Sequence, residues 1–377
     1  MTNPLRDLDA AGQAAWLDYV HRKILEDGEL QRLIDDDAVK GLTSNPSIFE
    51  KAIGEGDAYD DKIRALAKPE ESTEALYERI AIEDIQGAAD IFRHTYDRLF
   101  GRDGYVSLEV SPYLANDTQG TIDEARRLWK AVDRPNLMVK VPGTNAGAPA
   151  IRALIEDGLN INVTLLFSIE AYQAVAEAFV AGLEARAAKG QDISRIASVA
   201  SFFVSRIDTV IDKKIEALGT DDAKTQDAKT LAGKVAVANA KVAYAWYEDL
   251  ITSDRWKALA AKGAQPQRLL WASTGTKNPA YSDVLYIDEL IGPETVNTMP
   301  QKTMDAFRDH GVVAPTLTQD VAAARAILAK ADALGLDLAG VTRDLVTDGV
   351  KLFSESFDSL LGAVDEKLKA PAGQAKQ

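Results

Sequence analysis

Residues 137–142 read Leu-Met-Val-Lys-Val-Pro, a short run of large and β-branched apolar side chains interrupted by a single lysine. A run of this kind, too short for a helix and closed by a proline, is typical of a buried β-strand. Its central residue, Lys140, is costly to bury as an ammonium ion. The run therefore predicts a strand that either carries a functional amine or turns its lysine stem outward to reach water.

Similar runs recur along the chain, and helical stretches separate them. The eight runs are Trp16–Val20, Ala38–Thr43, Val106–Val110, Leu137–Val141, Asn160–Leu165, Ile196–Ala200, Leu269–Ser273 and Thr295–Met299. Strands that alternate with helices favour a parallel sheet, and this number of strands favours a closed barrel. No glycine-rich dinucleotide fingerprint follows the first run. The expected fold is α/β, a single (β/α)8 barrel of the TIM type with additional helices.

Two helical excursions, residues 45–105 and 207–268, are longer than a simple barrel needs. Neither contains a set of strands of its own, so we expect both to elaborate one domain that spans residues 1–377. Residues 370–377 are expected to form a frayed tail.

Two helix starts can be placed from the sequence. Thr121 followed by Glu124 has the spacing of a capping box. Ser168 is a typical N-cap in front of an apolar helical face, and Gly190 is expected to end that helix.

The composition excludes several classes of function. The chain has 377 residues and a net charge of -15, with its basic residues scattered among acidic ones, so neither nucleic acid nor an anionic membrane is an expected partner. It has no cysteine, and the histidines are too far apart in sequence to suggest a metal site. No segment has the form of a signal peptide or a membrane span, and the cytoplasm is the expected location.

Polar residues within or just after the runs are the candidates for chemistry, because such barrels place reacting groups at the carboxyl ends of their strands. The candidates are Asp18, Asn45, Glu109, Lys140, Asn162, Thr164, Ser201, Arg206 and Lys277. Burial favours the free amine of a lysine, which a Schiff-base nucleophile requires. Acids beside that amine can move protons as an imine forms and as a carbon–carbon bond breaks.

Most of these candidates also have a structural interpretation. Glu109 and Asp18 can be buried carboxylates that cap backbone amides or pair with Lys140. The asparagines and Ser201 can be ordinary polar groups at turns and strand ends, or they can bind sugar hydroxyls. Thr164 can be a β-branched strand residue and nothing more.

At these positions the sequence resembles the transaldolase family, in its longer bacterial form, over nearly the whole chain. The segments that carry the resemblance are Trp-Leu-Asp18-Tyr, Gly-Leu-Thr43-Ser-Asn45-Pro-Ser, Val-Ser-Leu-Glu109-Val, Met-Val-Lys140-Val-Pro and Asn160-Ile-Asn162-Val-Thr164-Leu-Leu-Phe-Ser. The chain departs from the family at Phe202, where proline is frequent, and at Lys277, where shorter members have arginine.

The resemblance implies a role for each candidate. Lys140 would form the Schiff base, and Asp18 would take the proton of the hydroxyl on the breaking bond. Glu109, with a water held by Thr164, would relay protons at the imine. The dihydroxyacetone part of the substrate would be bound by Asn45, Asn162 and Ser201, and its phosphate by Arg206 and Lys277.

The reaction that the resemblance implies belongs to the non-oxidative pentose phosphate pathway and uses neither a metal nor an organic cofactor. A dihydroxyacetone unit would pass from sedoheptulose 7-phosphate to glyceraldehyde 3-phosphate, giving erythrose 4-phosphate and fructose 6-phosphate. One alternative is a Schiff-base aldolase that acts on fructose 6-phosphate and releases free dihydroxyacetone. Another is a barrel that serves only as a binding or scaffolding protein. The sequence does not specify an oligomeric state.

Overall fold

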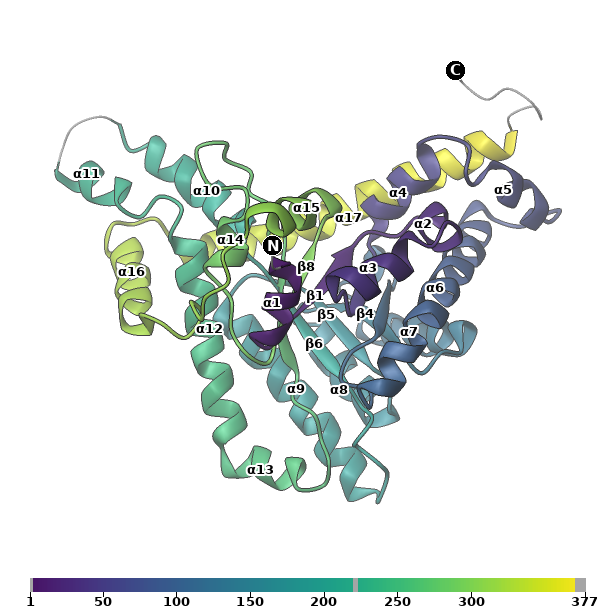
Figure 1. Ribbon diagram of the computed structural model, residues 1–377, viewed down its shortest axis with the longest axis horizontal. Helices are drawn as coiled ribbons and strands as arrows, with labels where there is room; N and C mark the ends of the chain where they lie inside the picture. Colours follow the sequence, from purple (N-terminus) through teal and green to yellow (C-terminus); the bar gives the residue numbers. More distant parts are fainter. Residues whose placement is uncertain (1–2, 220–222, 370–377) are drawn as a thin grey trace.

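A computed structural model of the chain describes residues 3–219 and 223–369 (Figure 1). Its centre is a closed barrel of parallel strands in sequence order, in which β1 pairs with β8. The strands are β1 Gln13–Asp18, β2 Gly41–Thr43, β3 Tyr105–Glu109, β4 Leu137–Pro142, β5 Ile161–Leu166, β6 Ser198–Phe203, β7 Arg268–Ala272 and β8 Thr295–Met299. The predicted (β/α)8 barrel with additional helices is confirmed.

Helices surround the barrel and fill the longer connections (Figure 1). They are α1 Pro4–Ala10, α2 Arg22–Glu26, α3 Glu29–Asp37, α4 Pro46–Gly54, α5 Asp60–Leu66, α6 Thr73–Arg98, η1 Pro112–Leu114, α7 Thr118–Val132, α8 Gly147–Asp157, α9 Ile169–Ala188, α10 Ser205–Glu216, α11 Ala223–Lys229, α12 Val235–Thr252, α13 Asp254–Ala260, α14 Leu285–Asp288, α15 Gln301–His310, α16 Val321–Ala333 and α17 Leu338–Lys369. Within the described residues, none of these helices combines the length and the apolar character that crossing a membrane requires.

Each of the eight predicted runs overlaps a strand, but three strands differ from the prediction by more than one residue at an end. The first strand begins at Gln13, because this glutamine is buried and donates to the carbonyl of Leu290 and to the hydroxyl of Thr295 inside the barrel. The second is shorter, since Ala38 adopts a left-handed conformation with φ of 55° that ends α3. The sixth begins two residues later and ends three residues later, at Ser198–Phe203.

The predicted capping box is wrong. Asp117, not Thr121, is the N-cap of α7, and its carboxylate accepts from the backbone N–H of Gly120. The Thr121 hydroxyl instead donates to the carbonyl of Leu114, while the carboxylate of Glu124 accepts from the backbone N–H of Ser111. Through these two hydrogen bonds, Thr121 and Glu124 hold the loop after β3 against α7.

The other helix signals are confirmed. The hydroxyl of Ser168 accepts from the backbone N–H of Ala171 at the start of α9. Gly190, two residues after the end of this helix, adopts φ of 70°, a conformation that glycine reaches without strain.

The two predicted excursions are occupied by helices. Residues 45–105 include α4, α5 and α6, and residues 207–268 include most of α10 with α11, α12 and α13. The predicted tail at 370–377 lies outside the described residues. The assignment of residues 1–377 to a single domain stays a prediction.

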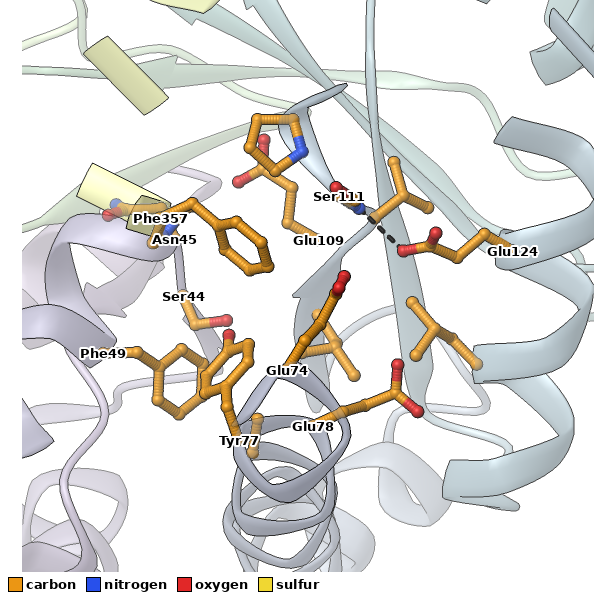
Figure 2. A pocket seen from close by; sticks show the side chains of 16 residues that line it. Ser44, Asn45, Phe49, Glu74, Tyr77, Glu78, Glu109, Ser111, Glu124 and Phe357 are labelled. Carbon is orange, nitrogen blue, oxygen red and sulfur yellow. Dashed lines mark hydrogen bonds between the residues drawn. The ribbon is translucent and has the colours of Figure 1, made fainter. Parts of the chain in front are cut away.

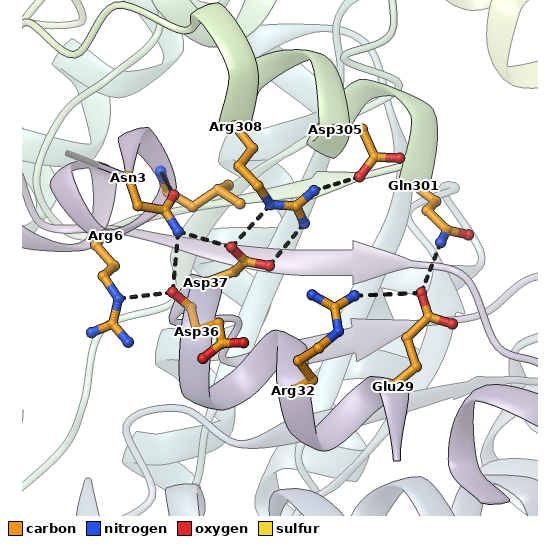
Figure 3. A network of polar contacts seen from close by, with 10 residues as sticks. Asn3, Arg6, Glu29, Arg32, Asp36, Asp37, Gln301, Asp305 and Arg308 are labelled. Carbon is orange, nitrogen blue, oxygen red and sulfur yellow. Dashed lines mark hydrogen bonds and ion pairs between the residues drawn. The ribbon is translucent and has the colours of Figure 1, made fainter. Parts of the chain in front are cut away.

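A polar cluster joins α3, which follows β1, to α15, which follows β8 (Figure 3). Asp37, at the end of α3, is buried and receives two hydrogen bonds from Arg308 of α15, at 2.9 and 2.8 Å. Asn3, just before α1, donates to the same carboxylate at 2.8 Å. Hydrogen bonds to a charged acceptor are stronger than neutral ones, so this cluster holds α3, α15 and the start of α1 together.

Candidate active site

A cavity of about 560 Å³ opens at the carboxyl ends of the strands. The sequence-predicted residues that line it are Asp18, Asn45, Lys140, Thr164, Ser201, Arg206 and Lys277. The two others lie directly behind this lining: Glu109 contacts Lys140, and Asn162 contacts Ser201. The barrel thus brings together residues that are as much as 259 positions apart, from Asp18 to Lys277.

Lys140 projects from the middle of β4 into this cavity and is only 5% exposed. Its Nζ lies 3.2 Å from Oε2 of Glu109 and donates to the backbone carbonyl of Ser44 at 3.1 Å. On another side the amine faces the ring of Phe353, whose centre is 5.7 Å away. The alternative in which the lysine stem turns outward to water is therefore wrong.

Burial and the charge of Lys140 both affect the pKa values of two carboxyl groups in the site, Glu109 and Asp18. Burial raises the pKa of Glu109, and the nearby charge of Asp18 raises it further, whereas the charge of Lys140 opposes the rise. Burial also raises the pKa of Asp18, against the charge of Lys140 and a 2.6 Å hydrogen bond from the hydroxyl of Thr43. Both acids therefore hold a proton more readily than a carboxyl group in water, which suits them to donate and accept protons beside the amine.

Thr164 and Glu109 have buried polar atoms that remain free for a further partner. Among residues 3–219 and 223–369, the hydroxyl of Thr164 forms no hydrogen bond, and neither does either carboxylate oxygen of Glu109 apart from the ion pair with Lys140. Directly after Thr164, Leu165 adopts φ of 61° and the pairing of β5 with β6 shifts register. The strand is irregular at the point where its side chains reach the cavity, as is common near active sites.

A chain of hydrogen bonds fixes the polar wall formed by β3, β5 and β6. The hydroxyl of Ser201 donates to Oδ1 of Asn162 at 2.7 Å, and Nδ2 of Asn162 donates to the hydroxyl of Ser107 at 3.0 Å. Ser201 lies within β6, not after it as the predicted strand boundary required. Ser107 was not identified from the sequence, because a serine inside an apolar strand carries no signal of its own.

Asn45 enters the site from the position just before a helix. It is the N-cap of α4, and its Oδ1 accepts from the backbone N–H of Ile48 at 3.1 Å. Pro46 follows at the first helical position, where a missing N–H does no harm. The cap fixes the orientation of the Asn45 amide at the cavity wall.

Cations gather at the outer part of the cavity. Arg206 lies at the start of α10, with its guanidinium 5.4 Å from the ring centre of Phe203, and burial lowers its pKa. Lys277 is exposed on the loop after β7, and Lys51 reaches the cavity from α4. Within the part of the chain that the structure describes, none of the three forms an ion pair, so their charges are available to an anion.

A second, smaller hollow of about 30 Å³ is lined in part by Glu109 (Figure 2). Its walls include Glu74, Glu78 and Glu124, together with Tyr77. Burial raises the pKa of Tyr77, and the surrounding carboxylates add to the rise. The hollow is acidic, in contrast to the outer part of the large cavity. No group of acidic or histidine side chains in the described residues is arranged to hold a metal ion.

Comparison with known proteins gives one consistent result. A family profile described as "Transaldolase/Fructose-6-phosphate aldolase" matches residues 15–364. A "Transaldolase" of Trichodesmium erythraeum is 48% identical over 98% of both chains. A "Transaldolase" of Parafrankia sp. is 48% identical over 99% of this chain and 100% of its own, and one of Thermobifida fusca is 49% identical over 98% and 100%.

Proposed function

This chain belongs to the transaldolase/fructose-6-phosphate aldolase family, and we infer that it is a transaldolase that transfers a dihydroxyacetone unit between phosphorylated sugars. The donor is sedoheptulose 7-phosphate and the acceptor glyceraldehyde 3-phosphate; the products are erythrose 4-phosphate and fructose 6-phosphate. The observation that carries this proposal is the buried amine of Lys140, 3.2 Å from the carboxylate of Glu109 inside the large cavity. The residue roles below are part of the proposal.

The first half of the reaction forms an imine. The amine of Lys140 attacks the ketone carbon of the donor, and the resulting carbinolamine loses water to give a protonated imine. Glu109 supplies and removes the protons of these steps. The free hydroxyl of Thr164 supports this assignment, because it can hold a water between the carboxyl group and the reacting carbon.

The second half breaks and remakes a carbon–carbon bond. Asp18 takes the proton of the hydroxyl on the bond to be broken, the bonding electrons move into the imine, and the aldehyde product leaves. The enamine that remains on Lys140 then attacks the acceptor aldehyde, and Asp18 returns the proton. Water adds to the new imine, and the carbon–nitrogen bond breaks to release the product and the free amine of Lys140. The raised pKa of Asp18 suits a group that must both accept and donate this proton.

The remaining polar residues bind the substrate. Asn45 and Ser201 face the hydroxyls of the dihydroxyacetone unit, and Asn162, which accepts from Ser201, fixes the direction of that serine hydroxyl. Arg206 and Lys277 hold the phosphate. Lys51 adds a third cation at the same end of the cavity. The lack of cysteine and the net charge of -15 support a cytoplasmic enzyme that binds neither nucleic acid nor membrane.

Borohydride trapping tests the proposal directly. Reduction in the presence of fructose 6-phosphate should leave a stable secondary amine on Lys140, which peptide mass mapping will locate. Lys140→Arg should abolish trapping, since a guanidinium stays protonated and cannot attack a carbonyl. An adduct on another lysine, or none at all, would refute the assignment of Lys140.

Asp18→Asn is the matched control for this experiment. Imine formation precedes the step assigned to Asp18, so the variant should still be trapped on Lys140. Its turnover should fall by about 10²–10⁴-fold, the usual effect of removing a general base. Loss of trapping in Asp18→Asn would place this residue in imine formation instead.

A further inference from the structure

The C-terminal helix α17 passes over the cavity and places one aromatic ring against the Schiff-base lysine. Phe353 is 5% exposed, lines the large cavity, and has its ring centre 5.7 Å from Nζ of Lys140. It lies 213 positions beyond Lys140 in the sequence, on a helix that packs beside α4 (Figure 1). The phenyl side chain has no polar atom, so it can neither bind nor deliver water.

Contacts one turn to either side fix the position of this ring. At Gly349, a Cβ atom would lie 2.8 Å from Cδ2 of Leu165, so glycine allows α17 to approach the end of β5 closely. At Phe357, the ring packs edge-on against Tyr77 and Tyr113, with centres 5.8 and 6.2 Å apart. Phe353 therefore lies between two anchored turns and has little freedom to move away from the amine.

The chemistry of the enamine makes this cover important. Release of dihydroxyacetone requires a proton on the enamine carbon that lost the aldehyde. Water must then add to the imine carbon, and the carbon–nitrogen bond breaks to return the free amine and the ketone. The sum is one enamine and one water converted to one amine and one dihydroxyacetone, so the step depends on water reaching the atoms next to Nζ of Lys140.

We propose that Phe353 is a specificity-determining residue, whose ring excludes water from the lysine-bound enamine and so favours transfer to an aldehyde over release of dihydroxyacetone. The proposal rests on the transaldolase activity inferred above. The face of a benzene ring also stabilises an adjacent cation, which favours the protonated imine without giving it a hydrolytic partner. Arg206, Lys277 and Lys51 line the same cavity, where they would hold the phosphate of the acceptor aldehyde.

The test compares release with transfer in Phe353→Leu and Phe353→Ala. Fructose 6-phosphate is supplied alone, and free dihydroxyacetone is measured; erythrose 4-phosphate is then added, and sedoheptulose 7-phosphate is measured. We expect the ratio of release to transfer to rise by about tenfold or more in Phe353→Ala. The leucine variant, which keeps most of the apolar volume, should show a smaller rise.

Phe357→Leu is the matched control, because it makes the same change one turn along α17 at a ring that packs on Tyr77 and Tyr113. Because Phe357 acts only by anchoring the turn beside Phe353, this variant should raise the ratio of release to transfer less than Phe353→Leu does. If release and transfer fall together in both Phe353 variants, or if Phe357→Leu raises the ratio equally, the ring has only a structural role and the proposal is overturned. If the unaltered protein neither transfers nor can be trapped on Lys140, the proposed function itself has failed, and this outcome is distinguishable from the others.

Discussion

Lys140 reaches the cavity because of its place in the alternation of β4. Glu109 pairs with Lys140 in the register of β3 and β4, and Lys140 pairs with Asn162 in that of β4 and β5. Residues paired across neighbouring strands point to the same face of a sheet, so one register sets the acid, the amine and the amide at one level of the barrel. A shift of β4 by one residue would turn Lys140 to the outside.

Arg206 and Lys277 are predicted to act mainly on substrate binding. A phosphate lies several bonds from the reacting carbons, so its contacts are similar in the ground and transition states, and Arg206→Ala should raise KM much more than it lowers kcat. A charge-assisted hydrogen bond contributes roughly 1.5–3 kcal/mol, so kcat/KM for a phosphorylated acceptor should fall by about tenfold to a hundredfold. Lys277→Ala should have a smaller effect, because this lysine is exposed and its charge is screened by solvent.

Unphosphorylated glyceraldehyde is the control acceptor for both variants. With it, kcat/KM should be nearly the same in Arg206→Ala as in the unaltered protein. An equal loss with both acceptors would mean that Arg206 supports the fold of the cavity wall, not the phosphate.

Among the elements, the junction between α6 and β3 depends on a single glycine. Gly104 adopts φ of 87°, and a Cβ atom there would lie 2.4 Å from the backbone nitrogen of Tyr96. The backbone of Gly104 is also held on both sides: its N–H donates to the carbonyl of Lys40, and its carbonyl accepts from the side chain of Asn136. The turn can therefore move away from an added methyl group only by breaking these bonds.

Gly104→Ala is expected to lower the free energy of unfolding by more than about 3 kcal/mol, because a left-handed conformation and a backbone clash add together. Gly28→Ala is the matched control: Gly28 has φ of 80°, but nothing lies within 4 Å of its added Cβ. It should lose only about 1 kcal/mol, the conformational part. Urea unfolding of both variants will measure the difference, and equal losses would contradict the role of the clash at Tyr96.

The sequence predicts the elements of this fold better than their ends. All eight strands were recognisable as short apolar runs, but the start of β1 was not, because Gln13 and the two alanines after it lack the β-branched pattern of a strand. The error at α7 has a similar origin. Asp117 and Thr121 are both good N-caps in sequence, and only the loop after β3, which bonds to Thr121 and Glu124, decides between them.

The site residues also differ in how far the sequence predicts them, according to whether they lie on strands or on helices. Residues on strands, such as Glu109 and Lys140, interrupt an apolar run with a charge and can be found from the sequence. Lys51, Phe353 and Gln301 also line the cavity, but they come from helices whose position depends on packing with distant elements. A lysine or a phenylalanine on an amphipathic helix has no local feature that predicts such a place.

At the scale of the whole molecule, the charge of the cavity opposes the charge of the chain. The net charge is -15, yet the lining of the large cavity holds Lys51, Lys140, Arg206 and Lys277 against the single acid Asp18. A recessed cluster of cations concentrates its field within the cavity, where low-dielectric walls limit screening. The cavity therefore favours an anion such as the phosphate of a sugar, although the net charge of the chain is negative.

Buried carboxyl groups also link the stability of the whole molecule to pH. Asp208 on α10 accepts from the backbone N–H of Ala236 at 2.8 Å and from the hydroxyl of Tyr286 at 3.0 Å. Asp212, one turn later, accepts in the same way from Gly233 and Tyr281. Burial raises the pKa of Asp208 from its usual 3.8 to about 7, and the neighbouring Asp212 adds to the rise.

The sign of the effect follows from this shift. Between pH 3.8 and about 7 the folded protein keeps a proton on Asp208 that the unfolded chain has released. The contribution of Asp208 to stability is therefore complete at low pH and is lost as the pH rises through about 7. Asp208→Asn has no such proton, so its free energy of unfolding relative to the unaltered protein should rise by about 2–3 kcal/mol between pH 5 and pH 8.

Urea unfolding at these two pH values, followed by the fluorescence of the 5 tryptophans, measures the change. Asp61→Asn is the control, because Asp61 is fully exposed and should leave the pH dependence as it is. Asp208 is buried and Asp61 is fully exposed, so a pH-dependent effect that appears only in Asp208→Asn reports the environment of Asp208. A gap between Asp208→Asn and the unaltered protein that is the same at pH 5 and pH 8 would show that Asp208 titrates near its usual pKa in the folded state.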